Sequence, residues 1–313
     1  MNAPIVDVHA HAIVPEIEAV VTGRAGLDAH RALDARRNGA ESLQVSGKMV
    51  AARIPQLVGV DRRLADMDAA GIDIQVVSPS PSHYHYWADR ELAQVVTSSA
   101  NRGIAALDDA VITCGLAGVE ISSFAPGVEL SDARLEPFWA RAADLGAVVF
   151  LHPFGCSLDE RLDRFYLSNT VGQPVENAVA LSHIIFAGVL DRHPTLRVLA
   201  AHGGGYLPTY IGRSDHAWEV RPEARRCTDR PSSYLPRITF DSLVHGAGAL
   251  RALVDAVGAE SVVLGSDYPF DMGITDPVSQ VRAAGLTEAA TRSILGDNAF
   301  RLGLSTASSG VQS

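Results

Sequence analysis

The sequence has few cysteines, no long apolar run and no signature of export. Its 3 cysteines, Cys114, Cys156 and Cys227, are an odd number without CxxC spacing, which excludes a disulfide framework and a zinc-thiolate knuckle. No stretch of about 18 apolar residues occurs, and no basic segment followed by an apolar one opens the chain. We therefore expect a cytoplasmic protein that does not bind a membrane.

Basic residues are also scarce. Lys and Arg number 26 against 36 Asp and Glu, for a net charge of −10, and no basic run stands beside aromatic residues, so nucleic-acid binding is not expected. What the chain has is 47% hydrophobic residues and 20% charged residues, with a mean hydropathy of +0.11, as in packed soluble proteins. Its 313 residues are a common length for one α/β barrel.

Short apolar runs, each ending in a polar or small residue, are typical of buried parallel strands. Helical patterns lie between most of them, and this alternation predicts a closed (β/α)₈ barrel. An open doubly wound sheet is the alternative, but no Gly-rich phosphate turn follows the first run. The eight predicted strands are Ile5–His9, Ile72–Ser78, Gly103–Leu107, Gly118–Ser122, Ala147–His152, Arg197–His202, Arg237–Asp241 and Ser261–Ser266. The predicted helices are Asp61–Ala70, Asp89–Asn101, Ala133–Leu145, Glu176–Arg192 and Ala247–Val257.

Two connections depart from a regular barrel. An insertion at about 14–58 precedes the first clear helical pattern, and we expect it to cover the site. The connection from Leu107 to Gly118 is too short for a helical crossover and indicates a truncated third unit. Either the third run is not a strand, or its helix is reduced to a turn, or part of the chain is absent. We expect one domain over residues 1–304 and a flexible tail at 305–313.

The strongest chemical signal is a pair of histidines at the end of the first run. His9 and His11 are two residues apart, so on a strand both imidazoles face the same side. The pair alone is a weak sign of a metal, but His152 ends the fifth run, His202 ends the sixth and Asp267 follows the eighth. Because the C-terminal ends of barrel strands converge on one cavity, these five side chains predict a metal site there.

Other histidines give weaker signals. His83 and His85 lie in the loop Ser78–Trp87, where contact with a substrate and exposure to water are both open. His245 follows the seventh run and is undecided, and His30, in the insertion, is expected to have no functional role. The three glycines at 203–205 lack the spacing of a phosphate cradle, so we interpret them as allowing close backbone approach to the metal pocket.

Four segments together resemble the amidohydrolase-related enzymes of the decarboxylase branch: HAH at 9–11, HPF at 152–154, HGGG at 202–205 and GSDYPF at 265–270. The resemblance runs from about Ile5 to Leu304 and implies a (β/α)₈ barrel with one divalent metal ion. That ion is expected to be zinc, with manganese or iron as alternatives. The resemblance implies that His9, His11, His152 and Asp267 hold the metal, and that His202 stays off it and handles the proton of the metal-bound water.

The resemblance also implies substrate contacts and an assembly. Arg53 and Arg213 are expected to bind the substrate carboxylate, Arg213 by reaching the site of a neighbouring subunit in a homodimer or larger homo-oligomer, and Phe154 is expected to line the substrate site. Hydroxybenzoate decarboxylases of this branch often carry a glutamate where this chain has His9. That departure favours the carboxymuconate-like group over the resorcylate-like group.

The expected function is a metal-dependent, non-oxidative decarboxylase, a C–C lyase, of a small unsaturated or aromatic carboxylic acid. A hydrolase of lactones, esters or amides, or a hydratase, shares the same ligands and remains an alternative. A barrel without activity that serves as a binding protein is a third possibility. The complete set of ligands argues against it.

Overall fold

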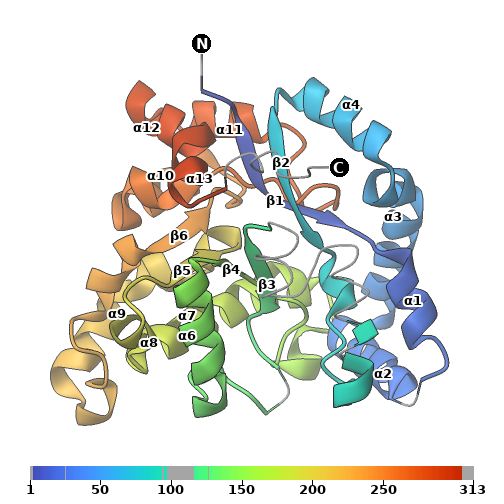
Figure 1. Ribbon diagram of the computed structural model, residues 1–313, viewed down its shortest axis with the longest axis horizontal. Helices are drawn as coiled ribbons and strands as arrows, with labels where there is room; N and C mark the ends of the chain where they lie inside the picture. Colours follow the sequence, from blue (N-terminus) through green and yellow to red (C-terminus); the bar gives the residue numbers. More distant parts are fainter. Residues whose placement is uncertain (1–2, 25, 94, 97–115, 126, 305–313) are drawn as a thin grey trace.

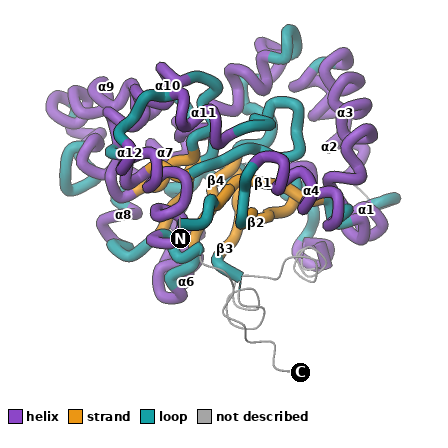
Figure 2. The backbone as a smooth tube through the Cα atoms, turned by 90° about the horizontal axis from the view of Figure 1, so that it is seen from above, coloured by secondary structure: helices purple, strands orange, loops and turns teal. Residues whose placement is uncertain are grey.

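The computed structural model describes residues 3–304 apart from 25, 94, 97–115 and 126. Parallel strands form its centre and helices surround them (Figure 1, Figure 2). Strands β3 to β7 form one parallel sheet in sequence order, and β1 pairs in parallel with β2. The strands in the described part of the chain are β1 (Val6–Ala12), β2 (Ile74–Pro79), β3 (Gly118–Ser122), β4 (Val148–His152), β5 (Arg197–Ala200), β6 (Ile238–Asp241) and β7 (Val262–Val263).

The last strand returns to the first. Beyond β7 the chain runs beside β1, where Val8 N donates to Leu264 O at 2.9 Å and Asp267 N donates to His9 O at 2.8 Å. This pairing joins the two sheets on one side, and the parallel strands with their outer helices have the arrangement of a (β/α)₈ barrel, which confirms the predicted fold class. It also brings Asp267 alongside the two histidines of β1.

Most strand bounds agree with prediction to within a few residues, and β3 agrees fully. β1 runs on to Ala12, three residues beyond its predicted end at His9. β5 ends at Ala200, so His202 is not a strand residue as predicted but lies in the 3-10 turn His202–Gly204, where its φ is 52°. The predicted third strand, 103–107, and most of the short connection after it lie outside the described residues.

An irregularity in β1 aims its histidines. The pairing of β1 with β2 shifts between Asp7 and Ala10. Val8 packs in the barrel interior with Phe150, and the His9 ring meets the Phe150 ring edge-on at 5.0 Å between centroids. Strict alternation would place adjacent residues on opposite sides of the strand, whereas a bulge lets them share one. The irregularity therefore turns His9 into the same interior as Val8.

The helices cover the outer side of the strands. α10 shows why, since its buried residues Leu250, Leu253 and Val257 recur at helical spacing and form one apolar stripe. The predicted helix Glu176–Arg192 is two helices, because Gly188 adopts a left-handed φ of 67°. The outer helices are α4 (Val60–Ala70), α6 (Glu136–Leu145), α7 (Gln173–Phe186), α8 (Val189–Arg192), α9 (Leu207–Val220), α10 (Ala247–Val257), α11 (Pro277–Ala283), α12 (Glu288–Arg292) and α13 (Asn298–Arg301). For the predicted helix Asp89–Asn101, the backbone is helical at 90–93 and 95–96, and residues 97–101 lie outside the described part.

The insertion after β1 is helical, which the sequence pattern did not predict. It forms α1 (Pro15–Val21), α2 (Leu27–Asn38) and α3 (Ala40–Val58), which lie together at one side of the barrel (Figure 1). α2 buries only Leu27 and α3 only Leu57, so neither helix carries the apolar stripe on which such predictions rest.

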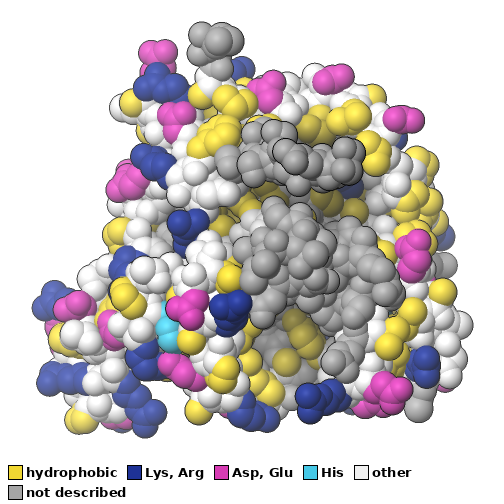
Figure 3. Space-filling model, viewed as in Figure 1, with side chains coloured by type: hydrophobic (Ala, Val, Ile, Leu, Met, Phe, Trp, Pro, Cys, Tyr) yellow, Lys and Arg dark blue, Asp and Glu magenta, His cyan; other side chains and the backbone are white. Residues whose placement is uncertain are grey.

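The described surface carries charges of both signs. Acidic and basic side chains are interspersed on the face shown in Figure 3. Within the described residues, no helix combines the length and the apolar character that crossing a bilayer requires.

Candidate metal centre

The two histidines of β1 meet at their Nε2 atoms. Both side chains are fully buried, and His9 Nε2 lies 3.1 Å from His11 Nε2. His152, the last residue of β4, places its ring 4.9 Å from each of the other two rings, nearly perpendicular to both. Three imidazoles from two strands therefore face one point at the C-terminal mouth of the barrel.

Asp267 completes the group from the segment beyond β7. Its Oδ1 lies 3.2 Å from His11 Nε2 and 3.4 Å from His9 Nε2. One ligand atom from each of His9, His11, His152 and Asp267 lies within 4.8 Å of the other three. Four donors at about 2.0–2.1 Å from a tetrahedral ion stand about 3.3 Å apart, which matches the three shortest separations.

Several polar atoms at this point lack hydrogen-bond partners in the described part of the chain. Neither ring nitrogen of His152 has a hydrogen-bond partner in the described structure, and Asp267 Oδ1 meets the two imidazoles without hydrogen-bond geometry. Buried polar atoms left unpaired cost free energy, so such a set is rare unless a ligand satisfies it. Three imidazole nitrogens and one carboxylate oxygen fit a divalent cation.

Asp241, the last residue of β6, orients the first histidine. Its Oδ2 lies 2.6 Å from His9 Nδ1, and its Oδ1 accepts from Gly203 N at 2.9 Å and Leu243 N at 3.1 Å. A carboxylate on Nδ1 holds the proton there and leaves Nε2 facing the site. Sequence reasoning missed this residue, although it ends a predicted strand at the same level as the expected ligands.

The carboxylates also set the proton affinity of His9. Burial disfavours the imidazolium, but the hydrogen bond to Asp241 and the contact with Asp267 outweigh it and raise the pKa of His9 to about 10. Burial and the neighbouring His11 and His9 hold the pKa of His152 well below its usual range. Without a metal, the site therefore keeps a proton on His9, which a cation has to displace.

His202 stands beside the donors without joining them. Its ring lies 5.0 Å from the His152 ring and 5.4 Å from the His9 ring. Burial, and then the charge of His9, lowers the pKa of His202 to about 4. The glycines after it allow close backbone approach, since a Cβ on Gly205 would stand 1.9 Å from Pro174 O, and both residues line the same cavity as His202.

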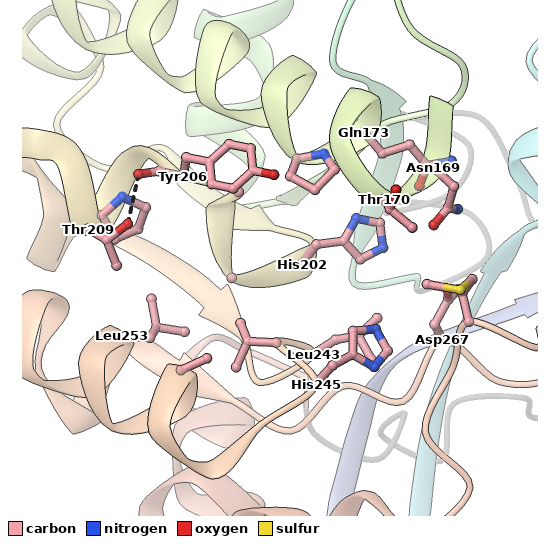
Figure 4. A pocket seen from close by; sticks show the side chains of 17 residues that line it. Asn169, Thr170, Gln173, His202, Tyr206, Thr209, Leu243, His245, Leu253 and Asp267 are labelled. Atoms are coloured by element: carbon pink, nitrogen blue, oxygen red, sulfur yellow. Dashed lines mark hydrogen bonds between the residues drawn. The ribbon is translucent and has the colours of Figure 1, made fainter. Parts of the chain in front are cut away.

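A cavity of about 500 Å³ opens beside this group. Asp267 and His202 line one end of it, and His245, undecided from sequence, also lines it (Figure 4). Asn169 and Thr170 line another wall, from the π-helical turn Ser168–Gly172 that directly precedes α7. The cavity thus has donors for a cation at one end and a mixed polar and apolar wall beyond them.

The three predicted substrate residues lie elsewhere. The Arg53 guanidinium donates to Pro269 O and lines a neighbouring cavity of about 320 Å³. Arg213 is exposed on α9 and does not line the cavity of His202. Phe154 lines a third cavity, of about 290 Å³, together with Tyr84 and other aromatic residues. The structure of one chain therefore does not bring them to the donor cluster.

His83 and His85 do not face water, which was one of the two interpretations left open from sequence, and contact with a substrate stays a prediction. Both are buried, with exposed fractions of 6% and 9%, and none of their ring nitrogens has a hydrogen-bond partner in the described structure. Neither residue lines the cavity that holds His202.

The barrel fold and the donor set are those of a metal-dependent enzyme. Residues 6–302 match the family described as amidohydrolase, and the chain belongs to that family. It is 31% identical over 329 residues to 2-amino-3-carboxymuconate-6-semialdehyde decarboxylase from Dictyostelium discoideum, with 96% of this chain and 91% of that protein covered.

Two solved structures share the fold. The 5-carboxyvanillate decarboxylase of Sphingomonas paucimobilis has a TM-score of 0.77 at 22% identity, with 97% of this chain and all of that chain (100%) covered. The 5-carboxyvanillate decarboxylase of Novosphingobium aromaticivorans, solved with manganese and 4-hydroxy-3-methoxy-5-nitrobenzoic acid, has a TM-score of 0.77 at 19% identity and covers 96% of each chain.

Proposed function

We propose that this protein is a metal-dependent, non-oxidative decarboxylase, a carbon-carbon lyase, of a small aromatic or unsaturated carboxylic acid. The observation that carries the proposal is the convergence of four donor atoms within 4.8 Å at the end of a cavity lined by His202. The relative from Dictyostelium, which matches nearly the whole chain, is a decarboxylase, and so are both solved structures named above.

In this proposal His9, His11, His152 and Asp267 hold one divalent ion. A divalent ion bound there would act as a Lewis acid that stabilises negative charge on a substrate oxygen. We propose zinc, because three imidazoles and one carboxylate suit it. Manganese, present in the Novosphingobium structure, and iron are the alternatives. Elemental analysis of the purified protein distinguishes them.

His202 is the proposed acid and base. Loss of CO₂ from a carboxylate leaves an electron pair on carbon, and one proton must be added to that carbon. With a pKa near 4, the His202 imidazole is neutral at pH 7 and can accept a proton from an acidic group in the cavity. It can then return that proton to the carbon, so that carboxylate plus proton becomes product plus CO₂.

We further propose a homodimer in which Arg213 enters the neighbouring site. Arg213 is exposed on α9, close in sequence to Tyr206 and Tyr210, whose exposed fractions are 42% and 70%. Large exposed aromatic side chains beside an arginine are typical of protein interfaces. Arg53 and Phe154 stay proposed substrate contacts, and residues 1–304 a proposed single domain. Light scattering of the purified protein measures the assembly.

The test of the reaction is CO₂ release. Zinc-loaded protein is incubated with 2,6-dihydroxybenzoate, 5-carboxyvanillate and other small aromatic and unsaturated acids, and with lactones, esters and amides of similar size. We expect CO₂ from at least one acid and none with the Asp267→Ala variant. Cleavage of a lactone, ester or amide, with no CO₂ from any acid, would refute the proposal and favour a hydrolase.

A further inference from the structure

The cavity beside the donor cluster lacks a cationic side chain. Among the described residues that line its roughly 500 Å³, none is an arginine or a lysine. Arg53 donates to Pro269 O and lines the neighbouring cavity, and Arg213 is exposed on α9. Within one chain, an acidic substrate that reaches the cluster therefore needs another group to recognise any second negatively charged oxygen.

His245 is placed to do this. It follows β6, it lines the cavity, and its side chain is exposed there. Figure 4 shows the imidazoles of His202 and His245 on opposite sides of the cavity, both near the end that Asp267 lines. Within the described residues its ring nitrogens have no hydrogen-bond partner in the chain, so an N–H is available to a ligand.

The backbone at His245 supports a functional role. Its φ is 52°, in the left-handed region that side chains other than glycine rarely adopt. His202 (φ 52°) and Asp267 (φ 59°) share this conformation, and the three residues line the same cavity beyond β5, β6 and β7. Sparsely populated backbone conformations at non-glycine residues concentrate at functional sites, where the surrounding structure maintains them.

We propose that His245 binds the non-reacting acidic oxygen of the substrate, opposite the donor cluster. One acidic group of the substrate is then directed to the cluster, and the other, a carboxylate or a phenolate, is directed to His245. This inference rests on the proposed function, because it takes the cluster as the seat of the reacting carboxylate. His245 contributes an imidazole N–H as a hydrogen-bond donor, and no covalent step is involved.

Binding of two probes tests the role without any turnover. Calorimetry measures the affinities of isophthalate, which has two carboxylates, and benzoate, which has one, for the zinc-loaded protein. We expect isophthalate to bind the wild type at least about tenfold more tightly. His245→Gly removes the imidazole while accepting the left-handed backbone, and we expect it to abolish this preference and leave benzoate affinity and zinc content unchanged. His245→Asn, which keeps an N–H donor and tolerates the same backbone, should retain part of it.

Two controls make the result specific. Thr209 lines the same cavity, but its side chain has no N–H donor. Thr209→Ala should therefore keep the preference for isophthalate over benzoate. Arg213→Ala tests whether a second copy supplies the recognition. A preference that survives His245→Gly, that is absent in the wild type, or that disappears in Arg213→Ala but not in His245→Gly would overturn the proposal. Because only binding is measured, this outcome is separate from success or failure of CO₂ release.

Discussion

The described residues contain two groups of buried and half-buried histidines, and the groups differ in what surrounds them. The metal cluster consists of His9, His11, His152 and Asp267. The loop cluster consists of His30, His83, His85 and Trp87, which the insertion helix α2 and the loop after β2 bring together. In the metal cluster the imidazole rings stand 4.9–5.0 Å apart. In the loop cluster His85 lies 6.5 Å from both His30 and His83.

Carboxylates account for the difference. His9 lies between Asp241 and Asp267, which raise its pKa to about 10 against the effect of burial. His83 and His85 are buried without such partners, and burial lowers the pKa of each to about 4. Both clusters hold three histidines, although His30 is only half-buried. In the metal cluster the three imidazoles and a carboxylate converge, with one ligand atom of each within 4.8 Å of the others, and this convergence is what attracts a cation.

The largest expected effect separates the two clusters directly. Asp267→Ala or His152→Ala removes one of four donors, and we expect loss of both the metal and detectable turnover. The matched change His83→Ala removes a buried histidine from the loop cluster and should leave the metal content near one ion per chain. Elemental analysis and CO₂ release measure both, and metal retained in Asp267→Ala would remove that residue from the ligand set.

Within the metal cluster, holding the ion and moving the proton should be separable. His202→Ala is expected to keep the metal and lower turnover by about 10² or more, because the proton carrier is lost while the donors remain. The measurement is turnover at equal metal loading. Wild-type turnover in this variant would assign the proton transfer to another group.

A carboxylate behind the donors should matter less than the donors themselves. Asp241→Asn loses the charge that fixes the His9 tautomer, and we expect metal affinity to fall by about 10- to 100-fold. Competition with a chelator measures it. Asp34→Asn is the matched control, since Asp34 contacts His30 of the loop cluster at 3.4 Å. Equal losses of affinity in the two variants would contradict a specific role for Asp241.

The smallest expected effect is that of pH on the free energy of unfolding, and its direction is opposite in the two clusters. Burial lowers the pKa of His83 and of His85 from about 6.5 to about 4. Their contribution to the free energy of unfolding is therefore complete above pH 6.5 and is lost as the pH falls toward 4. For each, the loss is on the order of 1–3 kcal/mol. In metal-free protein the raised pKa of His9 has the opposite effect, a contribution lost as pH rises toward 10.

Histidine NMR of the metal-free protein measures these values directly. We expect one imidazolium that persists above pH 8 and disappears in Asp241→Asn, while the rings of His83 and His85 stay neutral down to about pH 5. Denaturant unfolding at several pH values gives the corresponding free energies. Ordinary titration of all three histidines near pH 6.5 would contradict the contrast between the clusters.

The sequence predicted the barrel and the donor set for one physical reason. The parallel strands of a barrel end at the same rim, so a histidine or aspartate that follows an apolar run is expected to lie at that rim. Asp241 also ends an apolar run at this rim, but its role depends on a contact with His9, 232 residues away in the sequence, which no local pattern contains. This rule does not predict where the proposed substrate contacts Arg53, Arg213 and Phe154 lie, because packing sets the course of the segments that carry them.

Local pattern also failed where helices bury little. α2 and α3 of the insertion bury few residues and lack an apolar stripe, so no periodic pattern predicted either helix. The break in the predicted helix Glu176–Arg192 depends on the left-handed Gly188, a residue that a continuous helix also tolerates at modest cost. Both failures concern elements outside the strand ring, where burial constrains the chain least.

The carboxylate of Asp241 connects the donor cluster to the walls of the cavity. Through its two oxygens it joins the imidazole of β1 to the peptide groups of Gly203, next to His202, and of Leu243, two residues before His245. A shift of the ligand ring on cation uptake would be transmitted through that carboxylate to both walls of the cavity. Loading the ion and shaping the space for the acid would then be one event.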